Sequence, residues 1–195
     1  MEDNKLLLRE ICSRERGISP ETLEAVLVLA VEIAREGREG RKVGTMFVVA
    51  DVEKTLEHSR CLILDPLAGH PPERKVIGDP NMRETAKELA QLDGAFIVSD
   101  DGVFVSAARY IDASSAGIEL PLGLGSRQMA GASITMHSNA VAVVVSESSV
   151  VRVFDDGELV SEIIPELWLL RSEGMDGAYA TRGVEQMRVV EPEER

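Results

Sequence analysis

The apolar positions between residues 19 and 36 recur at the spacing of a helix face. Ser19 can cap the first turn of this helix, and Pro20 suits its first position. The face consists of Leu23, Val26, Leu27, Ala30, Val31 and Ala34. It can pack on the core of the same chain or on a partner subunit, and the pattern alone leaves both open.

Further along, the apolar residues form short continuous or alternating runs, which are typical of strands. Asp101-Gly102 and Asp156-Gly157 each divide a run in the manner of a tight hairpin turn. The runs cover residues 42–51, 60–65, 94–111, 140–147 and 149–163. We therefore expect six or seven strands, several of them paired as antiparallel hairpins.

Helical patterns alternate with these runs. Asn81, followed by Glu84 three residues later, resembles a capping box at the start of one helix. The predicted helices cover residues 1–16, 52–59, 81–92, 126–138 and 165–174. The fold class expected is α/β (α+β): a single domain with a mixed, mostly antiparallel central sheet of about six or seven strands surrounded by helices.

Composition narrows the class of protein. The net charge is −13 over 195 residues, and no basic stripe that could face nucleic-acid phosphates is visible. No apolar run approaches the roughly 20 residues of a membrane helix, and the acidic N-terminus lacks a signal-peptide pattern. We expect a cytoplasmic protein that binds neither nucleic acid nor membrane, with Cys12 and Cys61 as reduced thiols.

A glycine-rich turn at residues 123–127, "GLGSR", stands at the start of the helix predicted from residue 126. Glycines let a backbone approach a ligand closely, and exposed amides at a helix N-terminus bind anions. Ser126 offers a hydroxyl group, and Arg127 a planar set of donors. A serine-capped helix with a surface arginine in an ion pair explains the same residues without a ligand.

Two acidic positions could carry chemistry. Asp93-Gly94 lies where a helix meets a strand, and Ser146-Glu147 ends the most apolar strand. A carboxylate at such a position can ligate a hard metal ion or accept a proton. Asp93 can equally be a turn residue, and Ser146-Glu147 the start of a loop. A second Asp-Gly-Ala, at Asp176, has no strand or phosphate loop after it, so we assign it to a turn.

The segments "LDGAFIVSDDGVFVSAARYI", "LGLGSRQMAGASIT" and "AVAVVVSE" follow one another in this order. Together they resemble the diadenylate cyclase (DAC, DisA_N-type) domain family. The resemblance implies a division into an N-terminal helical segment (1–41), a diadenylate cyclase-like domain (42–165) and a C-terminal extension (166–195). It also implies the family's reaction, in which two ATP molecules give cyclic di-AMP and two pyrophosphates at a face-to-face dimer with Mn²⁺ or Mg²⁺.

Site residues carry over by position. The resemblance implies that Asp93 and Arg127 are catalytic, and that Asp93, Gln128 and Glu147 are candidate metal ligands. The nucleotide-binding residues that it implies are Gly94, Ala95, Tyr110, Ile111, Gly125, Ser126, Arg127, Gln128, Ser146 and Glu147. The family's Arg-His-Arg triplet reads Arg127-Gln128-Met129 here, which removes two groups able to carry positive charge.

Three hypotheses follow. The first is an active, metal-dependent diadenylate cyclase acting on ATP as a homo-oligomer. The second, suggested by Gln128 and Met129, is a module that binds ATP or cyclic di-AMP without turnover. The third is an oligomeric structural protein assembled through the helix that starts near Ser19.

Overall fold

A computed structural model describes residues 17–172, with side chains to residue 168. Its centre is one seven-stranded sheet in the order β2-β4-β3-β1-β5-β6-β7. The strands are β1 Thr45–Val49, β2 Ser59–Cys61, β3 Ala95–Val98, β4 Phe104–Ile111, β5 Val141–Val145, β6 Val151–Asp155 and β7 Glu158–Ile163. Among these strands only β1 and β3 pair in parallel, which confirms the predicted mixed, mostly antiparallel sheet.

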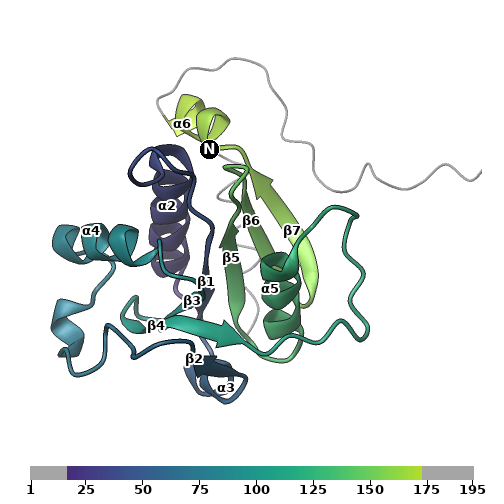
Figure 1. Ribbon diagram of the computed structural model, residues 1–195, viewed down its shortest axis with the longest axis horizontal. Helices are drawn as coiled ribbons and strands as arrows, with labels where there is room; N and C mark the ends of the chain where they lie inside the picture. Colours follow the sequence, from purple (N-terminus) through teal and green to yellow (C-terminus); the bar gives the residue numbers. More distant parts are fainter. Residues whose placement is uncertain (1–16, 173–195) are drawn as a thin grey trace, which may run out of the picture.

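Helices surround this sheet, as predicted (Figure 1). They are α2 Pro20–Glu36, α3 Val52–Glu57, the 3₁₀ turn η1 Pro72–Arg74, α4 Pro80–Leu89, α5 Ser126–Met136 and α6 Pro165–Ser172. Helices α2 and α4 lie on one face of the sheet and α5 on the other, with a hydrophobic core on each face. The central strands β1, β3 and β5 are buried throughout, which explains their continuous apolar runs.

Helix α2 begins as the sequence predicts. The Ser19 hydroxyl accepts a hydrogen bond from the Thr22 amide at 3.1 Å, and Pro20 takes the first helical position. Its apolar face, including Leu23 and Leu27, is buried in the core of the same chain against β5 and β6. Of the two packings left open by the sequence, the structure therefore has the intramolecular one. The division at residue 42 stays a prediction.

Local details differ from the sequence predictions in three places. Helix α4 is capped by Asp79 rather than Asn81, because the Asp79 carboxylate accepts the Asn81 amide at 2.8 Å. Strand β2 stops at Cys61, and the predicted strand residues that follow are exposed, Leu64 by 94%. Ser126 is the first residue of α5, whose cap is Gly125. The predicted helix at residues 1–16 and the turn at Asp176 lie outside the described residues.

Strand register gathers the candidate residues at one end of the sheet. Met46 pairs with Ala95 across the parallel strands, and Thr45 pairs with Val145 across the antiparallel ones. The start of β1, the start of β3 and the end of β5 therefore coincide. Asp93 and Glu147 each lie two residues beyond a strand, so they are at the same end of the sheet. In the described part of the chain, no helix is long and apolar enough to span a membrane.

Candidate active site

The Asp93-Gly94 junction has a backbone that requires glycine. Gly94 has φ of +106°, and a Cβ built there would lie 2.8 Å from the backbone of Arg109 on β4. Strand β4 bulges at this point, where Ala108 adopts a φ of +53° and the register with β3 shifts. The close approach fixes the start of β3 against β4. The Asp93 side chain, just before β3, is 84% exposed at this end of the sheet.

Arg127, on the first turn of α5, faces this carboxylate. Its Nη2 atom lies 3.5 Å from Oδ1 of Asp93, and its side chain is 26% exposed. The guanidinium also lies against Gly44: a Cβ at Gly44 would be 2.5 Å from Nη1 of Arg127 and 3.1 Å from Cγ of Glu147. Gly44 therefore provides the space that the Arg127 guanidinium occupies beside Asp93. No local sequence pattern marks this glycine, because its role depends on a residue 83 positions away.

The side chain of Gln128 folds back onto the glycine turn that precedes α5. Its side chain is nearly buried, with the residue 8% exposed, and Oε1 accepts a hydrogen bond from the Gly125 amide at 3.2 Å. Gly125 has no side chain to complete a reciprocal capping box, so only this half of the motif exists. The amide oxygen expected as a possible metal ligand is thus engaged in holding the glycine turn at the start of α5.

A cavity of about 510 Å³ contains these groups, a size that suits one mononucleotide. It is lined by nine of the residues expected from the resemblance: Asp93, Gly94, Tyr110, Ile111, Gly125, Ser126, Arg127, Gln128 and Glu147. Two others do not line it. Ala95 is buried in the hydrophobic core, and the Ser146 hydroxyl accepts a hydrogen bond from the Ser148 amide at 3.1 Å within its own turn.

The cavity wall also contains residues that no sequence pattern indicated, mainly apolar ones such as Met46, Leu62 and Ala113. Arg109 is the one charged residue among them, but its guanidinium is already hydrogen-bonded to β2. It donates to the Ser59 hydroxyl at 2.9 Å and to the Ser59 carbonyl at 2.9 Å. Of the cations that line this cavity, Arg127 is therefore the one directed at Asp93.

The acidic groups present fit a magnesium-type ion only in part. Among residues 17–172 no three His, Cys, Asp or Glu side chains are grouped so as to hold a metal. Mg²⁺, however, is commonly bound by one or two carboxylates together with substrate phosphates and water. The exposed Asp93 carboxylate, with Glu147 in the wall of the same cavity, would meet that lesser requirement with a bound triphosphate.

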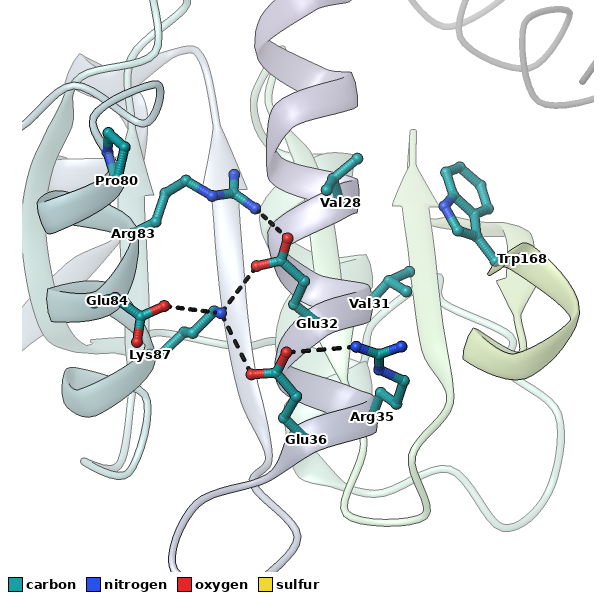
Figure 2. Close-up of a pocket in the computed structure, with 10 residues that line it drawn as sticks. All are labelled: Val28, Val31, Glu32, Arg35, Glu36, Pro80, Arg83, Glu84, Lys87 and Trp168. Atoms are coloured by element: carbon teal, nitrogen blue, oxygen red, sulfur yellow. Dashed lines mark hydrogen bonds and ion pairs between the residues drawn. The ribbon is translucent and has the colours of Figure 1, made fainter. Parts of the chain in front are cut away.

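A second hollow, of about 460 Å³, lies between α2, α4 and α6 (Figure 2). At its centre Lys87 of α4 reaches three carboxylates: Glu84 at 3.0 Å, Glu32 at 3.1 Å and Glu36 at 3.3 Å. Burial by itself would lower the pKa of Lys87, but hydrogen bonds to Glu84 and Glu32 and the neighbouring negative charges raise it overall. Two further cations join this group: Arg83 lies 2.7 Å from Glu32, and Arg38 lies 3.0 Å from Glu84. The resulting network of ion pairs joins α4 to α2.

The fold and the first cavity define a class: an α/β domain in which a helix N-terminus with an arginine faces an exposed carboxylate across a cavity. Residues 32–159 match the family model described as "DisA bacterial checkpoint controller nucleotide-binding" (DAC). The chain belongs to this DAC family.

Two curated relatives carry the name diadenylate cyclase. One, from Methanocaldococcus jannaschii, is 47% identical over 150 residues, which is 76% of this chain and 47% of the relative. The other, from Haloferax volcanii, is 41% identical over 152 residues, or 76% of this chain and 55% of the relative. The chain thus spans about half the length of the relatives it matches.

A solved structure has a similar fold. It is described as a hypothetical membrane spanning protein from Bacillus cereus and matches with a TM-score of 0.55 and 20% identity. The match covers 73% of this chain and 65% of that one. At this identity the likeness concerns the fold alone.

Proposed function

We propose that this chain is a diadenylate cyclase, which condenses two ATP molecules to cyclic di-AMP and two pyrophosphates. The observation that carries the proposal is the meeting of Asp93 and Arg127, at 3.5 Å, in a cavity of mononucleotide size at the start of α5. Family membership and the names of the two curated relatives support it.

The reaction requires each ribose 3′-oxygen to attack the α-phosphorus of the other ATP. One P–O bond forms, the bond to pyrophosphate breaks, and the 3′-hydroxyl proton leaves; this happens twice. Asp93 accepts or directs that proton, and Arg127 with the α5 amides neutralises phosphate charge. A divalent ion held by Asp93 and the triphosphate would lower the pKa of the hydroxyl and neutralise charge on the leaving group.

Two copies of the chain are needed, because one cavity accommodates one mononucleotide. A two-fold arrangement would bring each ATP opposite the other. Two exposed apolar residues of the cavity wall, Leu62 and Tyr110, would give such a contact apolar area.

The first experiment incubates the purified chain with ATP and either Mn²⁺ or Mg²⁺ and separates the products by chromatography. Cyclic di-AMP is the expected product, and the rate per chain should rise with protein concentration as dimers form. A folded oligomer that yields no cyclic di-AMP with either metal contradicts the proposal.

Mixing wild type with Asp93→Asn tests the two-copy arrangement. A mixed dimer has one competent carboxylate, so it forms one of the two bonds. The linear dinucleotide, with a single pyrophosphate released, should therefore accumulate. A mixture that yields only a diluted amount of cyclic di-AMP, with no linear species, counts against a shared site.

A second candidate function is binding of ATP or cyclic di-AMP without turnover. It is favoured by two side chains of the cavity wall that are already hydrogen-bonded within the protein: Gln128 to Gly125, and Arg109 to Ser59. Removing one preorganised charge-stabilising donor typically costs about 10²- to 10³-fold in rate. Calorimetry that shows nucleotide binding without product would establish this function. Gln128→His with Met129→Arg should then produce turnover.

A further inference from the structure

The exposed ring of Tyr110 on β4 has a cation on one face. The guanidinium carbon of Arg60 lies 4.3 Å from the ring centroid. The two residues are direct cross-strand partners, Arg60 on the edge strand β2 and Tyr110 on β4. Their contact is therefore set by the register of the sheet, in which opposite residues project from the same face.

The position of Arg60 is itself fixed. Its Nη1 atom donates to Oδ1 of Asp112 at 2.8 Å. The backbone amide of Asp112 in turn donates to the His58 carbonyl at 2.9 Å, which extends the pairing of the two segments. Asp112, Arg60 and the Tyr110 ring thus form an ordered series, which we call the ring clamp.

Tyr110 also lines the cavity that contains Asp93 and Arg127, together with Leu62 and Ile111. It is 43% exposed. Since Arg60 covers one face of the ring, a ligand has the opposite face or the edge available. A flat base that stacks there would be held by an aromatic ring whose tilt the ring clamp fixes.

We infer that Arg60 is a positioning residue for the nucleobase: it fixes Tyr110 so that the ring stacks on a purine, while the triphosphate lies toward Arg127. This inference rests on the proposed function and extends it to a residue outside the cavity wall. Arg60 acts through Tyr110 and does not contact the reacting atoms. Its loss should therefore weaken nucleotide binding and leave the bond-forming step nearly unchanged.

The test compares two ligands by calorimetry. One is 3′-deoxy-ATP, which has a base but lacks the attacking hydroxyl; the other is inorganic tripolyphosphate, which has no base. Arg60→Met should weaken 3′-deoxy-ATP about two- to fivefold, the range for an exposed cation–π contact, and leave tripolyphosphate binding unchanged. In kinetics KM for ATP rises while kcat stays near wild type, and Arg60→Lys restores part of the loss.

A double-mutant cycle separates the ring clamp from a general charge effect. In a Tyr110→Ala background, Arg60→Met should have no further effect on 3′-deoxy-ATP binding. Lys54→Met is the matched control: it also removes one exposed cation from an ion pair, with Glu57 at 2.7 Å on α3, and Lys54 does not line the cavity. It should leave both ligands unaffected.

An equal loss in both backgrounds, or an equal loss for tripolyphosphate, overturns the inference. If Arg60→Met fails to fold, Asp112→Asn removes only the carboxylate charge that anchors Arg60 and should weaken 3′-deoxy-ATP in the same direction; no weakening there also overturns it. Wild-type chain that binds neither ligand contradicts the proposed function instead, so the two failures are distinguishable.

Discussion

The guanidinium of Arg127 lies 3.5 Å from the carboxylate of Asp93. The two residues are 34 positions apart and come from different elements, the start of α5 and the junction before β3. Without a ligand they neutralise each other in part. A bound triphosphate would attract Arg127 and a cation would attract Asp93, so we expect the pair to separate when both bind.

Asp93→Asn should abolish synthesis of cyclic di-AMP while the fold is retained. The amide preserves shape but loses the charge that, in the proposed reaction, would hold a cation and accept a proton, and a general base alone contributes about 10²- to 10⁴-fold. Product formation by chromatography and the melting curve measure the two effects. Asp100→Asn, at an exposed position in the turn between β3 and β4, is the control and should retain wild-type activity.

Gly94→Ala should destabilise the protein by more than the backbone conformation alone explains. Its new Cβ would meet the Arg109 backbone at 2.8 Å, on top of a φ of +106°. Gly69→Ala is matched, because Gly69 also has a positive φ, +77°, but has no atom within 4 Å of the added Cβ. Strain at φ costs about 1 kcal/mol or more in both variants, and overpacking adds about 1–3 kcal/mol in Gly94→Ala. Equal denaturation midpoints would contradict the close approach.

Gly44→Ala should impair phosphate binding with little loss of stability. The added Cβ takes the space of Arg127 Nη1, which would be 2.5 Å away, and the arginine must move from Asp93. Calorimetry with tripolyphosphate should show weaker binding, while the melting temperature changes little because the side chain can shift. Gly78→Ala, where nothing lies within 4 Å, should bind tripolyphosphate as wild type does.

Substitutions of Gln128 should separate its structural role from a role in binding. Gln128→Ala removes the acceptor for the Gly125 amide, so unfolding free energy should fall by about 0.5–1.5 kcal/mol. Gln128→Glu keeps an acceptor, and its charge is favourable at a helix N-terminus. That variant should be as stable as wild type, yet bind ATP less tightly through repulsion of the triphosphate. If Gln128→Ala does not change the denaturant unfolding curve, the hydrogen bond from the Gly125 amide to Gln128 contributes nothing to stability.

Lys87→Met should lower the unfolding free energy by about 1–3 kcal/mol, below the range for fully buried pairs, because Glu32, Glu36 and Glu84 lose their shared cation. The pKa of Lys87 is raised above 10.5, so this stabilisation is complete below pH 10.5 and disappears as pH rises through the raised value. Wild type and variant should therefore converge in denaturant melts at alkaline pH. Equal unfolding free energies of wild type and variant at neutral pH would contradict a stabilising role of Lys87.

At acid pH the same network should lose stability as pH falls, because Glu84 becomes protonated. Hydrogen bonds from Lys87 and Arg38 lower the pKa of Glu84 below its ordinary 4.5. Its contribution is therefore present above pH 4.5 and is lost as pH falls through the lowered value. Lys54→Met serves as the control for both pH ranges, since both partners of its ion pair are about half exposed and surface pairs contribute little.

Much of the fold could be predicted from local patterns. Continuous apolar runs identified β1, β3 and β5, since strands covered on both faces need apolar residues at every position. Ser19 and Pro20 marked the start of α2. The edge strand β2 was predicted too long, because the exposed Leu62 to Leu64 look like strand residues locally. Only tertiary pairing with β4 shows where it ends.

The sequence by itself determined most of the described elements, the family and the identity of Asp93 and Arg127 as candidates, because these depend on neighbours along the chain. Only the tertiary structure decided which residues share the cavity. Gly44 leaves the space that the Arg127 guanidinium occupies. Arg109 is hydrogen-bonded to Ser59 on β2, and strand register places Arg60 against the Tyr110 ring. The physical reason is that close approach and cross-strand pairing join residues far apart in the chain, and no local pattern records the distance between them.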